Sequence, residues 1–230
     1  MAAVAQSPHQ LRLLRREAQA KVRTGLNTIL AAQDDWEKAD QMARAAAGEL
    51  TNAILSSRYL TDQRWGVLAL LPGLQAAAKL KYWTHQARSI QTMSHSLEAM
   101  TAAVALLRET ASSVTALGPD SAGQRQAVYP GAVFANLTIS TLGAWFCEIS
   151  RMYEEDLEVM QQLGNSLYVF WGAEAGKGDG LETQQLKVRA TEDIRSNLEV
   201  LLATWMLHPK MQEARRDDII GTIMEEMRGF

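Results

Sequence analysis

Residues 18–53 read AQAKVRTGLNTILAAQDDWEKADQMARAAAGELTNA. Apolar side chains return every three or four residues through this stretch, which is the repeat of a helix that packs lengthwise against other helices. One heptad position carries mainly large residues and the other carries Ala or Gly, so we expect a seam that alternates large with small side chains. The two positions hold Val22, Ile29, Trp36, Ala43 and Leu50, and Ala18, Gly25, Ala32, Ala39, Ala46 and Ala53.

A second repeat of the same kind lies further along the chain and predicts a second long packing helix. We expect its aromatic residue, Trp83, to lie on the buried seam, and we expect the same for Trp36, Trp145 and Trp205 in their own helices. The two heptad positions hold Trp83, Ile90, Leu97, Val104 and Ala111, and Met93, Met100, Leu107 and Val114.

Start and stop signals divide the rest of the chain into further helices. Ser7-Pro8 is a favourable helix start, Gly118-Pro119-Asp120 is a breaker, and Pro209 stops the helix before it. No segment alternates apolar and polar residues as a strand would, so the chain is predicted to be all-α. We expect one domain, 1–230, built as an elongated antiparallel four-helix bundle with long coiled-coil-like helices and a short C-terminal helix. The expected helices cover about 8–55, 74–117, 138–170, 186–207 and 211–228, with a loop at 118–132.

The net charge of the chain, and the distribution of its basic residues, indicate which classes of partner it could bind. The formal net charge is −3, which argues against direct nucleic-acid binding by the whole protein, because phosphate neutralisation needs a clustered positive surface. The start of the chain is an exception, because it contains five Lys or Arg residues and only one acidic residue, Glu17, before residue 34. This basic stretch is either a solvated helix face or a contact for an acidic partner, a nucleic acid or an import receptor. It could also be read as a cleaved targeting segment, but the heptad repeat continues through it without a break, which argues against cleavage. The basic residues are Arg12, Arg15, Arg16, Lys21 and Arg23.

The sequence predicts an intracellular protein without a membrane partner. No apolar run approaches the roughly eighteen residues needed to cross a bilayer, and no secretory signal is present. A single cysteine, Cys147, cannot form an internal disulfide. We therefore expect a nuclear or cytoplasmic location and not secretion.

No constellation of residues predicts catalysis. The run Gly172–Gly178 has one residue too few for a phosphate loop and lacks Ser or Thr after its lysine. None of the four histidines has Glu three residues before it, as a di-metal helical bundle would require. The acidic run Glu154, Glu155, Asp156 and Glu158 is expected to be a solvated face. We accordingly expect a protein that is not an enzyme, with no catalytic, cofactor-binding or metal-binding residues.

Two segments in the last hundred residues resemble a known family. Residues 148–157, EISRMYEEDL, and residues 202–209, LATWMLHP, are similar to the cyclin-dependent kinase 2-interacting protein family. That family has a helix with a Met-Tyr pair and a nearby acid-Leu, then a late Trp-containing helix that closes on His and Pro. The helix around Trp36-Glu37 is similar to the family's first helix. The likeness covers most of the chain, with matching residues in the last third.

The resemblance implies a non-enzymatic adaptor of a nuclear complex linked to DNA replication, the cell cycle, DNA-damage checkpoint signalling and ribosome biogenesis. Its implied partners are an AAA-type ATPase, other small helical subunits and a cyclin-dependent kinase. The heptad repeat suits equally well a cytoskeletal or ciliary coiled-coil protein, which is the alternative function. As candidate partner contacts we take Trp145, Tyr153, Trp205, His208 and Pro209.

Overall fold

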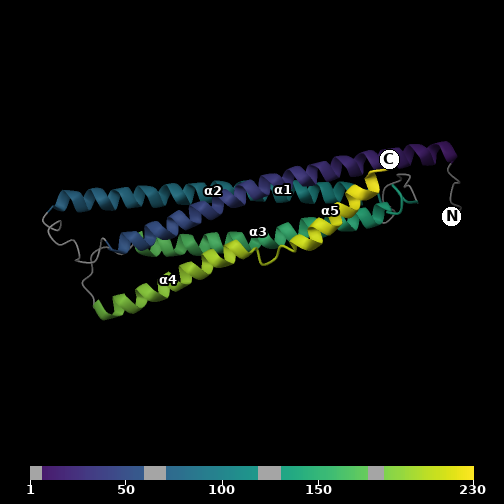
Figure 1. Cartoon of the computed structure of the whole chain (residues 1–230). Coiled ribbons are helices and arrows are strands. Elements are labelled where there is room, and N and C mark those ends of the chain that lie inside the picture. The colour runs from purple at the N-terminus through teal and green to yellow at the C-terminus, as the bar shows by residue number, and fades with distance from the viewer. Residues whose placement is uncertain (1–6, 60–70, 119–130, 176–183) are drawn as a thin grey trace. The chain divides into compact units, whose positions relative to one another are not determined.

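A computed structural model describes residues 7–59, 71–118, 131–175 and 184–230 of the chain. Five helices account for most of these residues, and none of them forms a strand, which confirms the all-α prediction for the described part of the chain (Figure 1). The helices are α1 (Pro8–Tyr59), α2 (Pro72–Thr115), α3 (Ile139–Ala175), α4 (Gln184–Leu207) and α5 (Glu213–Met227).

Some sequence expectations fall wholly or partly outside the described residues. These are most of the break between the expected helices 8–55 and 74–117, most of the predicted loop 118–132, and residues 176–178 of the Gly-rich run 172–178. The first half of that run is not a loop, because α3 continues to Ala175. Glycine weakens a helix only by about 1 kcal/mol relative to alanine, so Gly172 alone does not end α3. No described helix has both the length and the apolar character that crossing a membrane requires.

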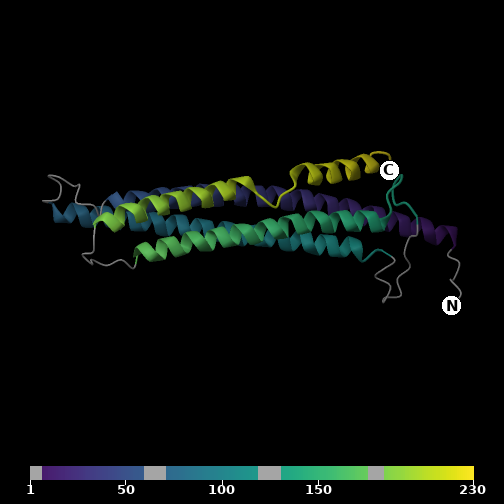
Figure 2. The ribbon, with the colours of Figure 1, turned by 90° about the horizontal axis from the view of Figure 1, so that it is seen from below.

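The helices group into two compact units. Unit 1 consists of residues 1–36, 101–155 and 210–230, and unit 2 of residues 37–100 and 156–209. α1, α2 and α3 each contribute one part to unit 1 and another part to unit 2. α4 belongs to unit 2 and α5 to unit 1, and a short non-helical segment, 208–212, joins the two helices (Figure 2).

The core of unit 1 is apolar and aromatic. Gly25 of α1 lies where an added Cβ would be 2.9 Å from the Phe146 ring of α3 and 3.3 Å from Val114 of α2. Because Gly25 has no side chain, both α2 and α3 can approach α1 closely at this position. Trp36 packs edge-to-face on Tyr153, with ring centroids 5.2 Å apart.

The segment before α3 is fixed to α1 by the basic start of the chain. Val133 and Phe134 are buried, and their carbonyl oxygens accept hydrogen bonds from the Arg15 guanidinium at 3.0 and 2.6 Å. Arg23 donates to the carbonyl oxygen of Phe230 and lies over the Phe134 ring. Arg15 and Arg23 thus serve contacts with distant parts of the chain, and Lys21 pairs with Glu17 within α1, so these three basic residues are not simply a solvated face.

The core of unit 2 includes more polar side chains. α1 and α2 run in opposite directions here, because Glu49 accepts a hydrogen bond from Ser89 while Ser57, further along α1, meets Gln86, which is earlier in α2. Apolar residues such as Leu50, Met93, Met160 and Leu198 are fully buried beside this polar seam. Among the residues of unit 2 whose burial is described, the buried polar ones are Asp40, Thr51, Gln86, Ser89, Ser96 and Asp156.

The prediction that Trp83 lies on the buried seam is wrong, since its side chain is 54% exposed. The other members of its heptad position become progressively more buried along α2, through half-buried Ile90 to buried Val104. A straight α-helix drifts by about 20° per heptad against a strict seven-residue repeat. Three heptads separate Trp83 from Val104, so the drift turns Trp83 away from the core and brings Gln86 and Ser89 inward.

We predict opposite effects of alanine at two glycines of α1. In Gly25→Ala the new methyl group would lie too close to the Phe146 ring of α3. The variant should therefore be less stable by about 1–2 kcal/mol, despite the higher helix propensity of alanine. Gly48→Ala meets nothing within 4 Å and should stabilise by up to about 1 kcal/mol. Urea unfolding followed by circular dichroism measures both effects, and equal stabilisation by the two variants would contradict the close packing at Gly25.

Candidate functional site

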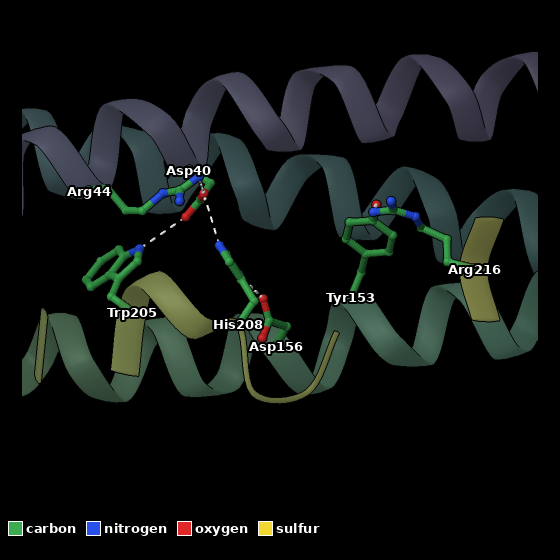
Figure 3. Close-up of polar contacts among 7 residues, drawn as sticks. All are labelled: Asp40, Arg44, Tyr153, Asp156, Trp205, His208 and Arg216. Carbon is green, nitrogen blue, oxygen red and sulfur yellow. Dashed lines mark hydrogen bonds and ion pairs between the residues drawn. The ribbon is translucent and has the colours of Figure 1, made fainter. Parts of the chain in front are cut away.

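A histidine that follows the last turn of α4 organises a buried ionic cluster in unit 2. α4 ends at Leu207, and Pro209 prevents the helix from continuing. His208, between them, has φ of 42°, in the left-handed region that non-glycine residues seldom adopt. This turn directs the imidazole back toward α1 and α3 (Figure 3).

Both ring nitrogens of His208 meet buried carboxylates. Nδ1 lies 2.6 Å from Oδ2 of Asp156 on α3, and Nε2 lies 3.1 Å from Oδ2 of Asp40 on α1. Asp40 also accepts a hydrogen bond from the Trp205 indole at 3.1 Å and pairs with Arg44 at 2.5 Å. We call these five residues, Asp40, Arg44, Asp156, Trp205 and His208, the His208 cluster (Figure 3).

The cluster holds His208 as an imidazolium. Hydrogen bonds to Asp156 and then to Asp40 raise its pKa from the ordinary 6.5 to about 9, against the opposing effect of burial. Both nitrogens therefore carry protons at neutral pH, and each donates to a carboxylate. Since neither nitrogen keeps a free lone pair, His208 is not placed to act as a general base at that pH.

Burial of these charges makes the partners depend on one another. The side chains of Asp156 and Asp40 are 0% and 3% exposed. An ionised carboxylate removed from water is costly unless it is paired and hydrogen-bonded. Oδ1 of Asp156 nevertheless has no hydrogen-bond partner among the described residues. Among the described residues, His208 is the cation that pairs with Asp156, so loss of His208 would leave this buried carboxylate without a compensating charge.

Asp40 was not among the candidate residues, and the prediction that Asp156 lies on a solvated face is wrong. Glu155 and Glu158 are exposed as expected, whereas Asp156 is fully buried. A signal was present, because Asp156 lies three residues after Tyr153 and four before Met160, on the apolar side of the helix. Asp40 similarly lies four residues after Trp36 and three before Ala43. An acidic residue at a core-facing position of a helix indicates a buried ion pair, because a buried carboxylate needs a partner.

The five candidate contact residues lie in different environments. Trp205 and Tyr153 are each 1% exposed, so their side chains serve packing within the chain. Trp145 and His208 are half-buried, and Pro209 is exposed. In unit 1, the Tyr153 hydroxyl accepts a hydrogen bond from Arg216 of α5 at 3.3 Å, and burial raises the pKa of Tyr153. The partner-contact role of these residues stays a prediction.

An exposed apolar face of α4 was not among the candidates. Val200, Met206 and Leu207 are 63%, 68% and 76% exposed, although the neighbouring Trp205 is buried. Val200 and Leu207 are seven residues apart and share one side of the helix with exposed Ala203. We call Val200, Ala203, Met206 and Leu207 the α4 face. It lies directly before His208, so the His208 cluster fixes the end of the helix that carries it.

The described residues contain no group of His, Cys, Asp and Glu arranged to hold a metal ion. No protein-family model matches the chain, and no curated protein sequence matches it. The His208 cluster and the α4 face are accordingly interpreted from their own geometry. The first is a structural ion cluster, and the second is an apolar surface.

We predict that His208→Gln destabilises the protein and removes a pH dependence. Because the folded pKa lies above the ordinary one, the stabilisation from His208 is complete below about pH 6.5 and is lost as the pH rises through about 9. The loss should reach up to about 3 kcal/mol in the wild type. At pH 6.5 the variant should be less stable by about 3 kcal/mol, because it leaves buried carboxylates without their cation.

Urea unfolding at pH 6.5 and 9.5 measures this difference. His95→Gln is the matched control, since His95 is an exposed residue whose side chain is 67% accessible and pairs with the similarly exposed Glu98. It should leave both stabilities within about 0.5 kcal/mol of the wild type. A His208→Gln variant that keeps the wild-type difference between the two pH values would refute the imidazolium assignment.

Proposed function

We propose that the chain is a non-enzymatic adaptor subunit of a nuclear multiprotein complex, and that the α4 face contacts a protein partner. The observation that carries the proposal is the exposure of Val200, Met206 and Leu207 beside a buried tryptophan. Contiguous apolar side chains on a surface are a frequent mark of protein contact. A helix end held by buried ion pairs presents such side chains in a fixed arrangement, which lowers the entropy lost on binding.

The resemblance to the cyclin-dependent kinase 2-interacting protein family supplies the proposed setting. Both of its best-matching segments contribute to the His208 cluster, one through Asp156 and the other through Trp205 and His208. We propose on this basis a role in replication, checkpoint signalling and ribosome biogenesis. The proposed partners are an AAA-type ATPase, other small helical subunits and a cyclin-dependent kinase. The proposed architecture is the elongated antiparallel four-helix bundle.

We predict that acidic residues on the α4 face abolish partner binding without unfolding the chain. Val200→Glu combined with Leu207→Glu should lower the yield of copurifying partners at least tenfold, equivalent to about 1.4 kcal/mol or more. Both positions are more than half exposed, so the melting temperature should change little. The measurement is quantitative mass spectrometry of proteins that copurify with the tagged chain from its own cells.

Val169→Glu is the matched control, because Val169 is also a valine of unit 2 and is 71% exposed. It should retain all partners. Recovery of an ATPase and small helical subunits in fixed proportion to the wild-type chain supports the proposal. Recovery of the chain alone, or of tubulin and axonemal proteins, contradicts it and favours the cytoskeletal or ciliary alternative.

A further inference from the structure

The first turns of α2 bury little of their surface. Among residues 73–85, all of which the structure describes, no side chain is buried. The residues that continue the core-facing side of the helix here, Gln75, Ala78 and Tyr82, are half-buried. Most of the stability of a helix in a protein comes from packing one face on its neighbours, and an isolated helix shorter than about 12–15 residues is marginal in water. These turns of α2 therefore gain little stability from the rest of unit 2.

The next turns of α2 meet the core mainly with polar side chains. Between residues 86 and 96 the buried side chains are Gln86, Ser89, Met93 and Ser96. Met93 is the one apolar residue of the four, and the Ser96 hydroxyl has no hydrogen-bond partner within the described part of the chain. A buried hydroxyl that lacks a partner opposes folding instead of favouring it. Residues 73–96, which we call the α2 arm, thus have a single buried apolar side chain.

Three long hydrogen bonds join the α2 arm to α1 and α3. They measure 3.3–3.5 Å and are donated by Gln86 to Ser57, by Ser89 to Glu49 and by Tyr168 to the carbonyl oxygen of Ile90. Usual donor–acceptor distances are about 2.5–3.0 Å for a hydroxyl donor and about 2.7–3.2 Å for an N–H donor. All three bonds exceed these ranges, so they hold the arm weakly.

The shorter polar contacts of unit 2 join the other helices. The His208 cluster connects α1, α3 and α4 through hydrogen bonds and ion pairs of 2.5–3.1 Å, and none of its five residues comes from α2. Close packing of α2 begins after the arm, because a Cβ added at Gly164 of α3 would be 3.0 Å from the Leu97 side chain and Met100 is fully buried. The arm can therefore separate while the other three helices stay joined.

We infer that the α2 arm is a conformational device, which opens away from α1 and α3 about a hinge at residues 97–100 while the rest of unit 2 stays folded. Opening breaks the three long hydrogen bonds, exposes Met93 and gives the Ser96 hydroxyl access to water. Segments with few buried apolar contacts open in this way at a free energy well below that of global unfolding. The inference concerns the free chain and does not depend on the adaptor function.

We predict that hydrogen exchange of the full-length chain, followed by mass spectrometry, detects this opening. After correction for intrinsic rates, amides of residues 86–96 should exchange about tenfold or more faster than amides of residues 156–163 in α3, because they need only the local opening. In about 1 M urea, exchange in residues 156–163 should accelerate while exchange in residues 86–96 changes little, since a local opening exposes little surface.

Two substitutions that improve the contacts of the arm should close it. Gln86→Leu replaces a buried polar side chain with an apolar one, and Ser96→Ala removes the hydroxyl that lacks a partner. Together they should slow exchange in residues 86–96 by about tenfold or more. Gln91→Leu is the matched control, because Gln91 is exposed on the same helix, and it should leave the rates within about twofold of the wild type.

His208→Gln provides the opposite comparison. It weakens the joint between α1, α3 and α4, so exchange in residues 156–163 should become about tenfold or more faster while residues 86–96 keep their rates. Equal exchange of the two segments in the wild type overturns the inference. So does an equal response of both segments to His208→Gln or to the closing substitutions, because the arm would then open only when the whole protein unfolds.

Discussion

Two carboxylates buried on different helices, Asp40 and Asp156, set the main constraint on unit 2. Each must keep a cationic or hydrogen-bonding partner, because a lone buried charge costs several kcal/mol. His208 satisfies both at once, and it reaches them only because the chain turns sharply after Leu207. The unusual backbone conformation of His208 is offset by the contacts that it permits. The position of the end of α4, and of the α4 face before it, follows from this pairing.

The helices were predictable and the ion cluster was not. Apolar spacing and the signals at Pro8 and Pro209 place helices where the structure has them, because both depend on local sequence. The His208 cluster joins residues more than 150 positions apart, and periodicity says nothing about which helix faces which. The core-facing positions of Asp40 and Asp156 indicated burial but could not identify the partner. Trp83 was misplaced because a strict heptad was extended over a helix that follows its own 3.6-residue period.

The two units differ in how their cores are stabilised. Unit 1 relies on aromatic contacts such as Trp36 with Tyr153, whereas six polar residues are buried in the part of unit 2 that the structure describes. Thr51 and Ser96 each have a hydroxyl oxygen without a hydrogen-bond partner among the described residues, at about 1–3 kcal/mol each. Regions of lower local stability often carry binding surfaces. The α4 face belongs to unit 2.

Neither unit is a continuous segment of chain. Unit 1 draws on residues 1–36, 101–155 and 210–230, and unit 2 is incomplete without residues 156–209. Most multidomain chains fold in order during synthesis, with the N-terminal domain first. That order does not apply to this protein, because neither unit can be completed from the residues that leave the ribosome first. α1 and α2 can pair early, through contacts such as Ser89 with Glu49, but the apolar seams that α3, α4 and α5 cover stay accessible to chaperones until those helices have been translated.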